Sequence, residues 1–183
     1  MPVSNLFLDS SILLDNIIPR RRKQHSCSCK LIEEIRTHKD RFNAWTADFN
    51  LSETLGQLKN EKEVEEGKSY SPYELLTPHQ IGKMVEIIEA FTQVENIEIF
   101  KPKPILQEEL FEKVKNLCIQ AKDALVLASA LYLKKEIGKD VILVTRDERL
   151  LIRGRKAMRT THPINLIDSC PECLGYSTCK FRK

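Results

Sequence analysis

The sequence lacks the features that mark membrane and secreted proteins. No apolar run approaches the roughly 18 residues that a membrane span needs. The first residues, MPVSNLFLDSS, contain no basic leader followed by an apolar stretch and a small-residue cleavage site. Internal repeats and low-complexity tracts are also missing, so a repeat architecture is excluded. These absences predict a cytoplasmic protein with no membrane partner.

The sequence also has little excess charge. Its 29 basic and 26 acidic side chains leave a formal net charge of +3, too small to identify a polyanionic partner, so local clusters must decide. Apolar residues make up 42% and charged residues 30%, as in ordinary globular proteins, and 183 residues suit one compact domain. No Ser/His/Asp or Cys/His set stands at the expected strand ends, which argues against nucleophilic hydrolases.

Strand and helix signals alternate along the chain. This order predicts an α/β fold, a three-layer sandwich with a central parallel sheet. Apolar β-forming residues predict strands at 3–9, 42–47, 96–100, 141–145 and 164–167. Apolar periodicity and helix-start signals predict helices up to residue 18, at 30–41, 51–59 and 77–91, from 104, and at 121–137.

Residues 1–168 are expected to form one domain. A charged stretch near residues 60–71 has almost no apolar side chains, and we interpret it as a surface insertion. Residues 169–183 form a cysteine-bearing C-terminal tail with few large apolar side chains. Such a tail cannot form a core alone and needs a metal or a partner surface to be ordered.

Four carboxylates are predicted to converge at one edge of the sheet. Asp9 and Asp147 each follow a strand, and the carboxyl ends of strands are where open α/β sheets build their sites. Glu53 and Asp123 lie near the beginnings of helices that start from the same edge. Clustered carboxylates repel one another unless hard divalent cations, which prefer oxygen ligands, neutralise them. The pattern therefore predicts a catalytic magnesium or manganese site that can hydrolyse a phosphodiester.

Three of these acids also have a purely structural interpretation. Asp123 is suited to cap the helix at 121–137, Glu53 to pair with Asn50 in a capping box, and Asp147 to open a turn. Asp9 has no such capping role, because it ends a buried strand.

Four segments resemble the ordered motifs of PIN domains. They are 6–15 (LFLDSSILLD), 50–58 (NLSETLGQL), 121–131 (AKDALVLASAL) and 141–147 (VILVTRD), and the resemblance covers roughly residues 3–168. It matches the acids of the family's site to Asp9, Glu53, Asp123 and Asp147, and the family's small hydroxyl residue to Ser10 or Ser11.

The resemblance implies an endoribonuclease that cuts single-stranded RNA with one or two magnesium or manganese ions, and it implies frequent homodimers. A toxin with an antitoxin partner and an RNA-maturation enzyme with a processing partner both stay open. The chain departs from the family at Arg149, where many members carry another acid, in its long insertion and in its cysteine-bearing tail.

Two other functions compete with the nuclease. One is a catalytically silent PIN-like module that binds RNA or a protein. The other is an aspartate-dependent phosphatase, which is disfavoured because Ser11 stands where such enzymes need a second acid.

Basic side chains cluster in two places. The densest run consists of Arg20, Arg21, Arg22 and Lys23 after the first helix, and we predict that it binds RNA phosphates. A solvated basic loop is the alternative. The second region lies beside Asp147 and contains Arg146, Arg149, Arg153, Arg155, Lys156 and Arg159.

Most of the cysteines lie near the two ends of the chain, as Cys27, Cys29, Cys170, Cys173 and Cys179. The parallel topology places both groups at the same sheet edge, which predicts a structural zinc clasp between tail and body, with His25 and His162 as substitute ligands. Unmodified thiols or an incidental disulfide are the alternative. Cys118 is expected to be a small buried residue on a helix.

Overall fold

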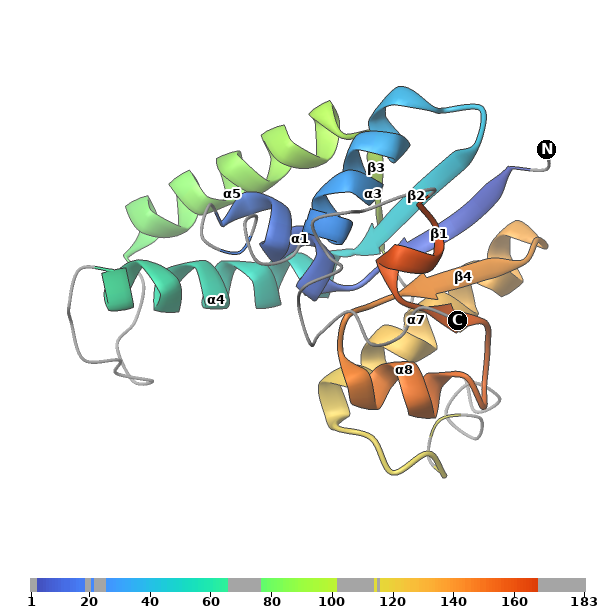
Figure 1. Ribbon diagram of the computed structural model, residues 1–183. Coiled ribbons are helices and arrows are strands. Elements are labelled where there is room, and N and C mark those ends of the chain that lie inside the picture. Colours follow the sequence, from blue (N-terminus) through green and yellow to red (C-terminus); the bar gives the residue numbers. More distant parts are fainter. Residues whose placement is uncertain are drawn as a thin grey trace.

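The computed structural model describes residues 3–18, 21, 26–65, 77–101, 114 and 116–167. Within this part of the chain, a parallel five-stranded sheet forms the middle layer (Figure 1). The strands are β1 (Ser4–Leu8), β2 (Phe42–Ala47), β3 (Ile97–Phe100), β4 (Val141–Val144) and β5 (Thr160–Thr161). Their order is β3-β2-β1-β4-β5, so β1 and β4 lie side by side at the centre.

Helices cover both faces of this sheet (Figure 1). They are α1 (Ser10–Ile17), α3 (Ser26–Thr37), α4 (Asp48–Glu65), α5 (Pro78–Val94), α7 (Ala121–Ile137) and α8 (Glu148–Gly154), with a short 3-10 helix at Pro163–Asn165. Of these, α1 and α3 lie over one face, and α7 and α8 over the other. The three-layer α/β sandwich predicted from the sequence is confirmed.

Side chains that alternate along β1 build the two cores. Leu6 and Leu8 face α1 and α3, whereas Phe7 faces α7, and all three are fully buried. The four residues of β4 are likewise buried on both faces. A strand covered on both sides has no exposed face, which explains why Leu6–Leu8 and Val141–Val144 are continuous apolar runs.

Most predicted elements are confirmed, with shifted ends. The strand at 42–47 and the helix at 121–137 have the predicted bounds, and the latter ends at Gly138, whose φ of 61° is left-handed. The helix expected at 51–59 is longer, since α4 runs from Asp48 to Glu65 and includes the start of the charged stretch. The rest of that stretch, and the helix expected from residue 104, lie outside the described residues.

The predicted last strand at 164–167 is wrong. The edge strand is Thr160–Thr161, which pairs with Leu143 and Val144, and a 3-10 helix follows at Pro163–Asn165. Proline has no N–H to donate to a sheet and a fixed φ suited to a helical turn. The side chain of His162 accepts the backbone N–H of Ile164 (3.3 Å), which also favours the turn over a strand.

Within the described residues, none of the helices is both long and apolar enough to cross a membrane.

Candidate functional site

Asp9 lies at the carboxyl end of β1, in the middle of the sheet. Its backbone N–H donates to the carbonyl of Val144 (3.0 Å), so the pairing of β1 with β4 continues into the site. Only 6% of Asp9 is exposed. Its carboxylate therefore has a fixed place between the two central strands.

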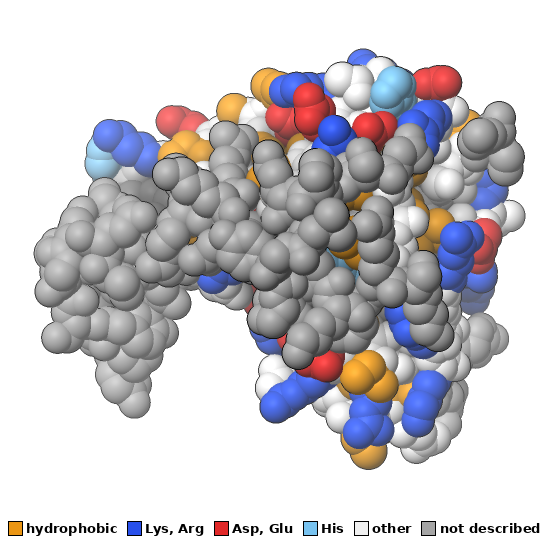
Figure 2. Space-filling model, in the orientation of Figure 1, with side chains coloured by type: hydrophobic (Ala, Val, Ile, Leu, Met, Phe, Trp, Pro, Cys, Tyr) orange, Lys and Arg blue, Asp and Glu red, His pale blue; other side chains and the backbone are white. Residues whose placement is uncertain are grey.

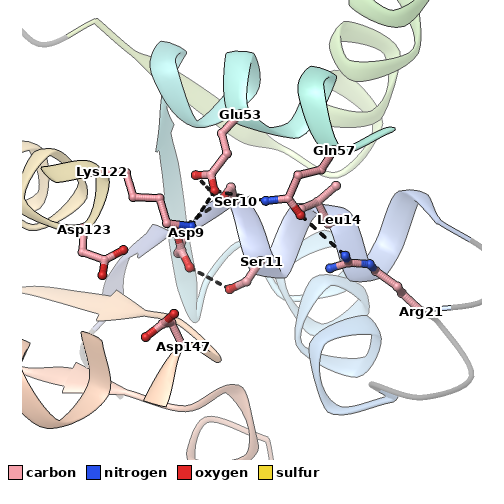
Figure 3. A pocket seen from close by; sticks show the side chains of 10 residues that line it. All are labelled: Asp9, Ser10, Ser11, Leu14, Arg21, Glu53, Gln57, Lys122, Asp123 and Asp147. Atoms are coloured by element: carbon pink, nitrogen blue, oxygen red, sulfur yellow. Dashed lines mark hydrogen bonds and ion pairs between the residues drawn. The ribbon is translucent and has the colours of Figure 1, made fainter. Parts of the chain in front are cut away.

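Glu53 reaches the same edge from α4. The carbonyl of Leu8, at the end of β1, accepts hydrogen bonds from the side chains of Thr46 and Asn50, each at 3.0 Å. Asn50 thus ties α4 to β1 from inside the helix, because α4 begins at Asp48. The capping-box interpretation of Glu53 is therefore wrong, and Glu53 is directed at the other acids (Figure 3).

Asp123 and Asp147 come from the other half of the sheet. Asp123 lies in the first turn of α7, and the N-cap residue of that helix is Gln120, so the capping interpretation of Asp123 is wrong. Asp147 is the N-cap of α8, where its Oδ1 accepts the backbone N–H of Leu150 at 2.9 Å. Asp147 therefore has the structural role that the sequence offered as an alternative, and it also faces the acids.

All four predicted acids line a single pocket at the carboxyl edge of the sheet (Figure 3). The complete lining consists of Asp9, Ser10, Ser11, Leu14, Arg21, Glu53, Gln57, Lys122, Asp123 and Asp147. The residues that the sequence singled out are thus together in space, although they come from four different elements.

Hydroxyl groups hold the carboxylate of Asp9. Ser11 and Thr145 each donate to its Oδ2 at 2.7 Å. The hydroxyl of Ser10 lies 3.3 Å from Asp9 Oδ1 and 2.8 Å from Glu53 Oε2, so it links two of the acids. Thr145 was not predicted as a site residue, although it stands between the β4 strand and Asp147 in the sequence.

Lys122 is a second residue that the sequence analysis missed. Its ammonium group lies 2.9 Å from Glu53 Oε1, and the side-chain amide of Gln57 donates to the same oxygen at 3.1 Å. Arg21 lies at the far side of the pocket, where it donates to Gln57 at 3.5 Å. A lysine beside an aspartate carries no sequence signal that separates it from a solvated lysine.

Burial and neighbouring charge raise the pKa of two acids in the pocket, Asp9 and Asp123. Burial, and then the charges of Asp147, Asp9 and Glu53, raise the pKa of the Asp123 carboxyl to about 6, against the opposing effect of Lys122. Burial raises the pKa of Asp9 as well, although the hydroxyls of Ser11 and Thr145 oppose the shift. The pocket therefore has more negative charge than its own cations neutralise.

This donor set fits a hard divalent cation, which prefers carboxylate and hydroxyl oxygens. Within the described residues, no three acidic, histidine or cysteine side chains lie close enough to hold one ion as they stand. Repulsion keeps carboxylates apart, and Glu53 pairs with Lys122 instead. The acids would therefore have to move closer together to hold a cation.

Comparison with known proteins decides the family. A family model described as the PIN domain matches residues 6–156. The chain belongs to the PIN-domain family. PIN domains are generally nucleases and usually depend on a metal, so the resemblance found in the sequence is confirmed at that level.

The solved structures support the same fold. The crystal structure of PAE2754 from Pyrobaculum aerophilum is similar to this PIN domain, with a TM-score of 0.50 and 16% identity over 91% of this chain and 93% of that chain. At this identity, the likeness shows the fold alone. A search of the curated proteins finds no match.

A buried ion pair stabilises the edge of the PIN domain that carries the acid pocket. Arg146 pairs with Asp15, which is fully buried on α1 and also accepts the hydroxyl of Ser28 at 2.7 Å. The backbone N–H of Arg146 lies 3.3 Å from the hydroxyl of Ser11. Burial raises the pKa of Asp15 to about 6, although Arg146 opposes the shift. The pair joins α1, α3 and the loop that carries Asp147.

Only some of the predicted basic and cysteine residues lie within the described part of the chain. Arg20, Arg22, Lys23, His25, Cys170, Cys173 and Cys179 lie outside the described residues. Cys27 lies on α3 and is buried in the core. Cys29, two positions later on the same helix, contacts the carbonyl of Asp15 at 3.6 Å. Residues two apart on a helix do not face each other, which disfavours their joint binding of one ion. The zinc clasp stays a prediction.

Two further residues differ from expectation. Cys118 is exposed and lies before α7 with a left-handed φ of 52°, so its prediction as a buried helical residue is wrong. Its neighbours Leu117 and Ile119 pack into the core, which leaves Cys118 pointing outward. His162 is buried and caps a turn, and burial lowers its pKa to about 4. His162 is therefore a neutral structural residue.

The ion pair leads to a prediction about stability. Replacing Arg146 by Met leaves Asp15 as a buried charge without its guanidinium, which is expected to lower the free energy of unfolding by about 3–5 kcal/mol at pH 7.5. Adding Asp15→Asn should restore much of this loss, because the buried charge is then gone. Urea unfolding of the three proteins measures both effects. If the free energy of unfolding of Arg146→Met lay within about 1 kcal/mol of wild type, the ion pair would be unimportant for stability.

The raised pKa of Asp123 predicts how stability depends on pH without metal. Its folded value of about 6 lies above its ordinary 3.8, so the folded state binds the proton more tightly. The contribution of Asp123 to stability is then fully present below pH 4 and is lost as the pH rises through 6. In EDTA, Asp123→Asn should remove about 2 kcal/mol of the fall in stability between pH 4.5 and 7.5.

Urea unfolding at several pH values tests this prediction, with Asp140→Asn as the control. Asp140 is an exposed acid that pairs with Lys134 at the opposite edge of the sheet, so its replacement should leave the pH dependence of stability almost unchanged. Equal pH dependence in wild type and Asp123→Asn would contradict the electrostatic coupling described above.

Proposed function

We propose that the protein is a metal-dependent endoribonuclease that hydrolyses phosphodiester bonds of single-stranded RNA. Its catalytic and metal-binding residues are Asp9, Glu53, Asp123 and Asp147. The observation that carries this proposal is the single pocket that carboxylates from four parts of the chain line, in which burial and neighbouring acids raise the pKa of Asp9 and Asp123. Such a pocket favours a bound divalent cation over the empty state.

The four acids are proposed to hold magnesium or manganese, which supplies a Lewis acid for the phosphate and activates water for attack. Asp9 is the residue best fixed for this role, since hydroxyls on two elements orient its carboxylate. Ser10 links Asp9 to Glu53 and sets their separation. These residues position the acids before any ligand binds, which lowers the cost of assembling the site.

Lys122 is proposed to have two roles in this reaction. In the structure it neutralises Glu53, and its ammonium group is half-exposed at the pocket. If Glu53 binds a cation instead of Lys122, the ammonium group of Lys122 can contact a phosphate oxygen of the RNA. The positive charge of Lys122 thus offsets the repulsion between a polyanionic substrate and four carboxylates.

A catalytically silent module is the second candidate, and the pocket disfavours it. Burial of Asp9 and Asp123 costs stability in the absence of a cation, as their raised pKa values indicate. A module that only binds RNA or protein has no need for these charges. The toxin and RNA-maturation roles, an antitoxin or processing partner, and a homodimer remain predictions.

Cleavage of RNA tests the proposed function. With Mn²⁺ or Mg²⁺, the wild-type protein is expected to cut a labelled single-stranded RNA of mixed sequence, and EDTA should stop it. Asp9→Asn and Asp123→Asn are expected to slow cleavage by at least about 100-fold, because metal catalysis stabilises the transition state by several kcal/mol and each 1.36 kcal/mol or so is tenfold.

Asp140→Asn is the matched control, because it removes an exposed acid far from the pocket. It should cut at the wild-type rate. Undiminished cleavage by Asp9→Asn, or by wild type in EDTA, would reject the metal-dependent mechanism. RNA binding without cleavage by wild type in either cation would favour the silent module.

A further inference from the structure

The helix after Asp147 carries a surface with exposed basic side chains. Arg149, Ile152 and Arg153 are exposed and recur at the spacing of one helix face, and exposed Lys156 follows in the next turn. We call these four residues the α8 surface. Figure 2 shows Lys and Arg side chains with hydrophobic ones between them in the region that α8 occupies in Figure 1.

The cations of the α8 surface pair with none of the acids that the structure describes. Within the described part of the chain, no carboxylate forms an ion pair with Arg149, Arg153 or Lys156, whereas Lys134 pairs with Asp140 at 2.6 Å. Arg149 and Arg153 are one turn apart, about 6 Å along the axis, and like charges at this spacing destabilise a helix. The folded chain alone therefore gives no reason for this arrangement.

The α8 surface has a fixed position relative to the acids. Asp147, which lines the pocket, is the N-cap of α8 and holds its first turn through Leu150. The opposite side of the helix is packed, with Leu150 and Leu151 buried. At its end, a Cβ added to Gly154 would lie 2.9 Å from the hydroxyl oxygen of Thr160, so α8 and β5 are in close contact. The surface thus begins beside the pocket on a rigid element.

We propose that the α8 surface binds the phosphate backbone of the RNA strand that enters the acid pocket. This inference rests on the proposed function and adds where the substrate lies. Arginines fit phosphates through two parallel hydrogen bonds, and no acid among the described residues competes for Arg149 or Arg153. Exposed Ile152 between them offers an apolar contact for ribose or a base. Cations next to the pocket also offset the repulsion that its four carboxylates impose on a polyanion.

The test measures RNA binding apart from cleavage. A fluorescein-labelled single-stranded RNA of mixed sequence is titrated with the full chain in EDTA at several salt concentrations. Three phosphate contacts contribute about 2 to the slope of log affinity against log salt, at roughly 0.7 each for single strands. In the variant Arg149→Gln/Arg153→Gln/Lys156→Gln, the magnitude of this salt slope should be smaller by about 2 than in wild type. The variant should also bind the RNA roughly 10- to 100-fold more weakly in 0.1 M salt.

Two matched variants make the result specific. Lys39→Gln/Lys135→Gln/Lys139→Gln removes three exposed cations from the opposite edge of the sheet, so its net charge equals that of the first variant. It should bind like wild type. Arg149→Lys/Arg153→Lys keeps the charge and should keep the salt slope. Equal losses in both triple variants, or no loss in either, overturns the proposal. Wild type that binds RNA in this way but never cleaves it would refute the nuclease and leave the surface standing.

Discussion

The buried carboxylate of Asp9 is the constraint on which the site depends. It ends the central strand of the sheet, and its backbone continues the pairing of β1 with β4. One oxygen accepts hydroxyls from Ser11 on α1 and from Thr145 after β4. The hydroxyl of Ser10 connects the other oxygen to Glu53 on α4. Because burial of this charge is costly, the elements around it must supply donors. Two of these donors also contact other acids, since Ser10 donates to Glu53 and Thr145 accepts the backbone N–H of Asp147.

The sequence predicts the framework of this site well, for physical reasons. Strands buried on both faces contain continuous apolar runs, so the runs at 6–8 and 141–144 indicate the two central strands and point to the acids that follow them. The helix at 121–137 was predicted with its observed bounds because its apolar run ends at a left-handed Gly138. The edge strand Thr160–Thr161 was missed, since two residues carry no periodicity.

Contacts between distant side chains could not be predicted. The pairing of Lys122 with Glu53 joins residues that are 69 positions apart, and neither has an unusual sequence neighbourhood. The ion pair between Asp15 and Arg146 likewise spans 131 positions. Asp15 lies in the segment LFLDSSILLD, and nothing in that segment indicates its partner. Long-range polar pairs depend on packing, which local patterns do not encode.

Charge in the molecule is divided between two adjacent places. The pocket concentrates carboxylates that suit a hard cation, and the α8 surface beside it presents cations that suit phosphates. Asp147 connects the two, since it lines the pocket and is the N-cap residue of the helix that carries the α8 surface. The proposed function requires that the four acids form one site for magnesium or manganese. Crystals soaked in Mn²⁺ test it through the anomalous signal of manganese. A peak about 2.0–2.3 Å from oxygens of Asp9 and of Asp123 or Asp147 is expected. No peak in the pocket at saturating Mn²⁺ would contradict the claim.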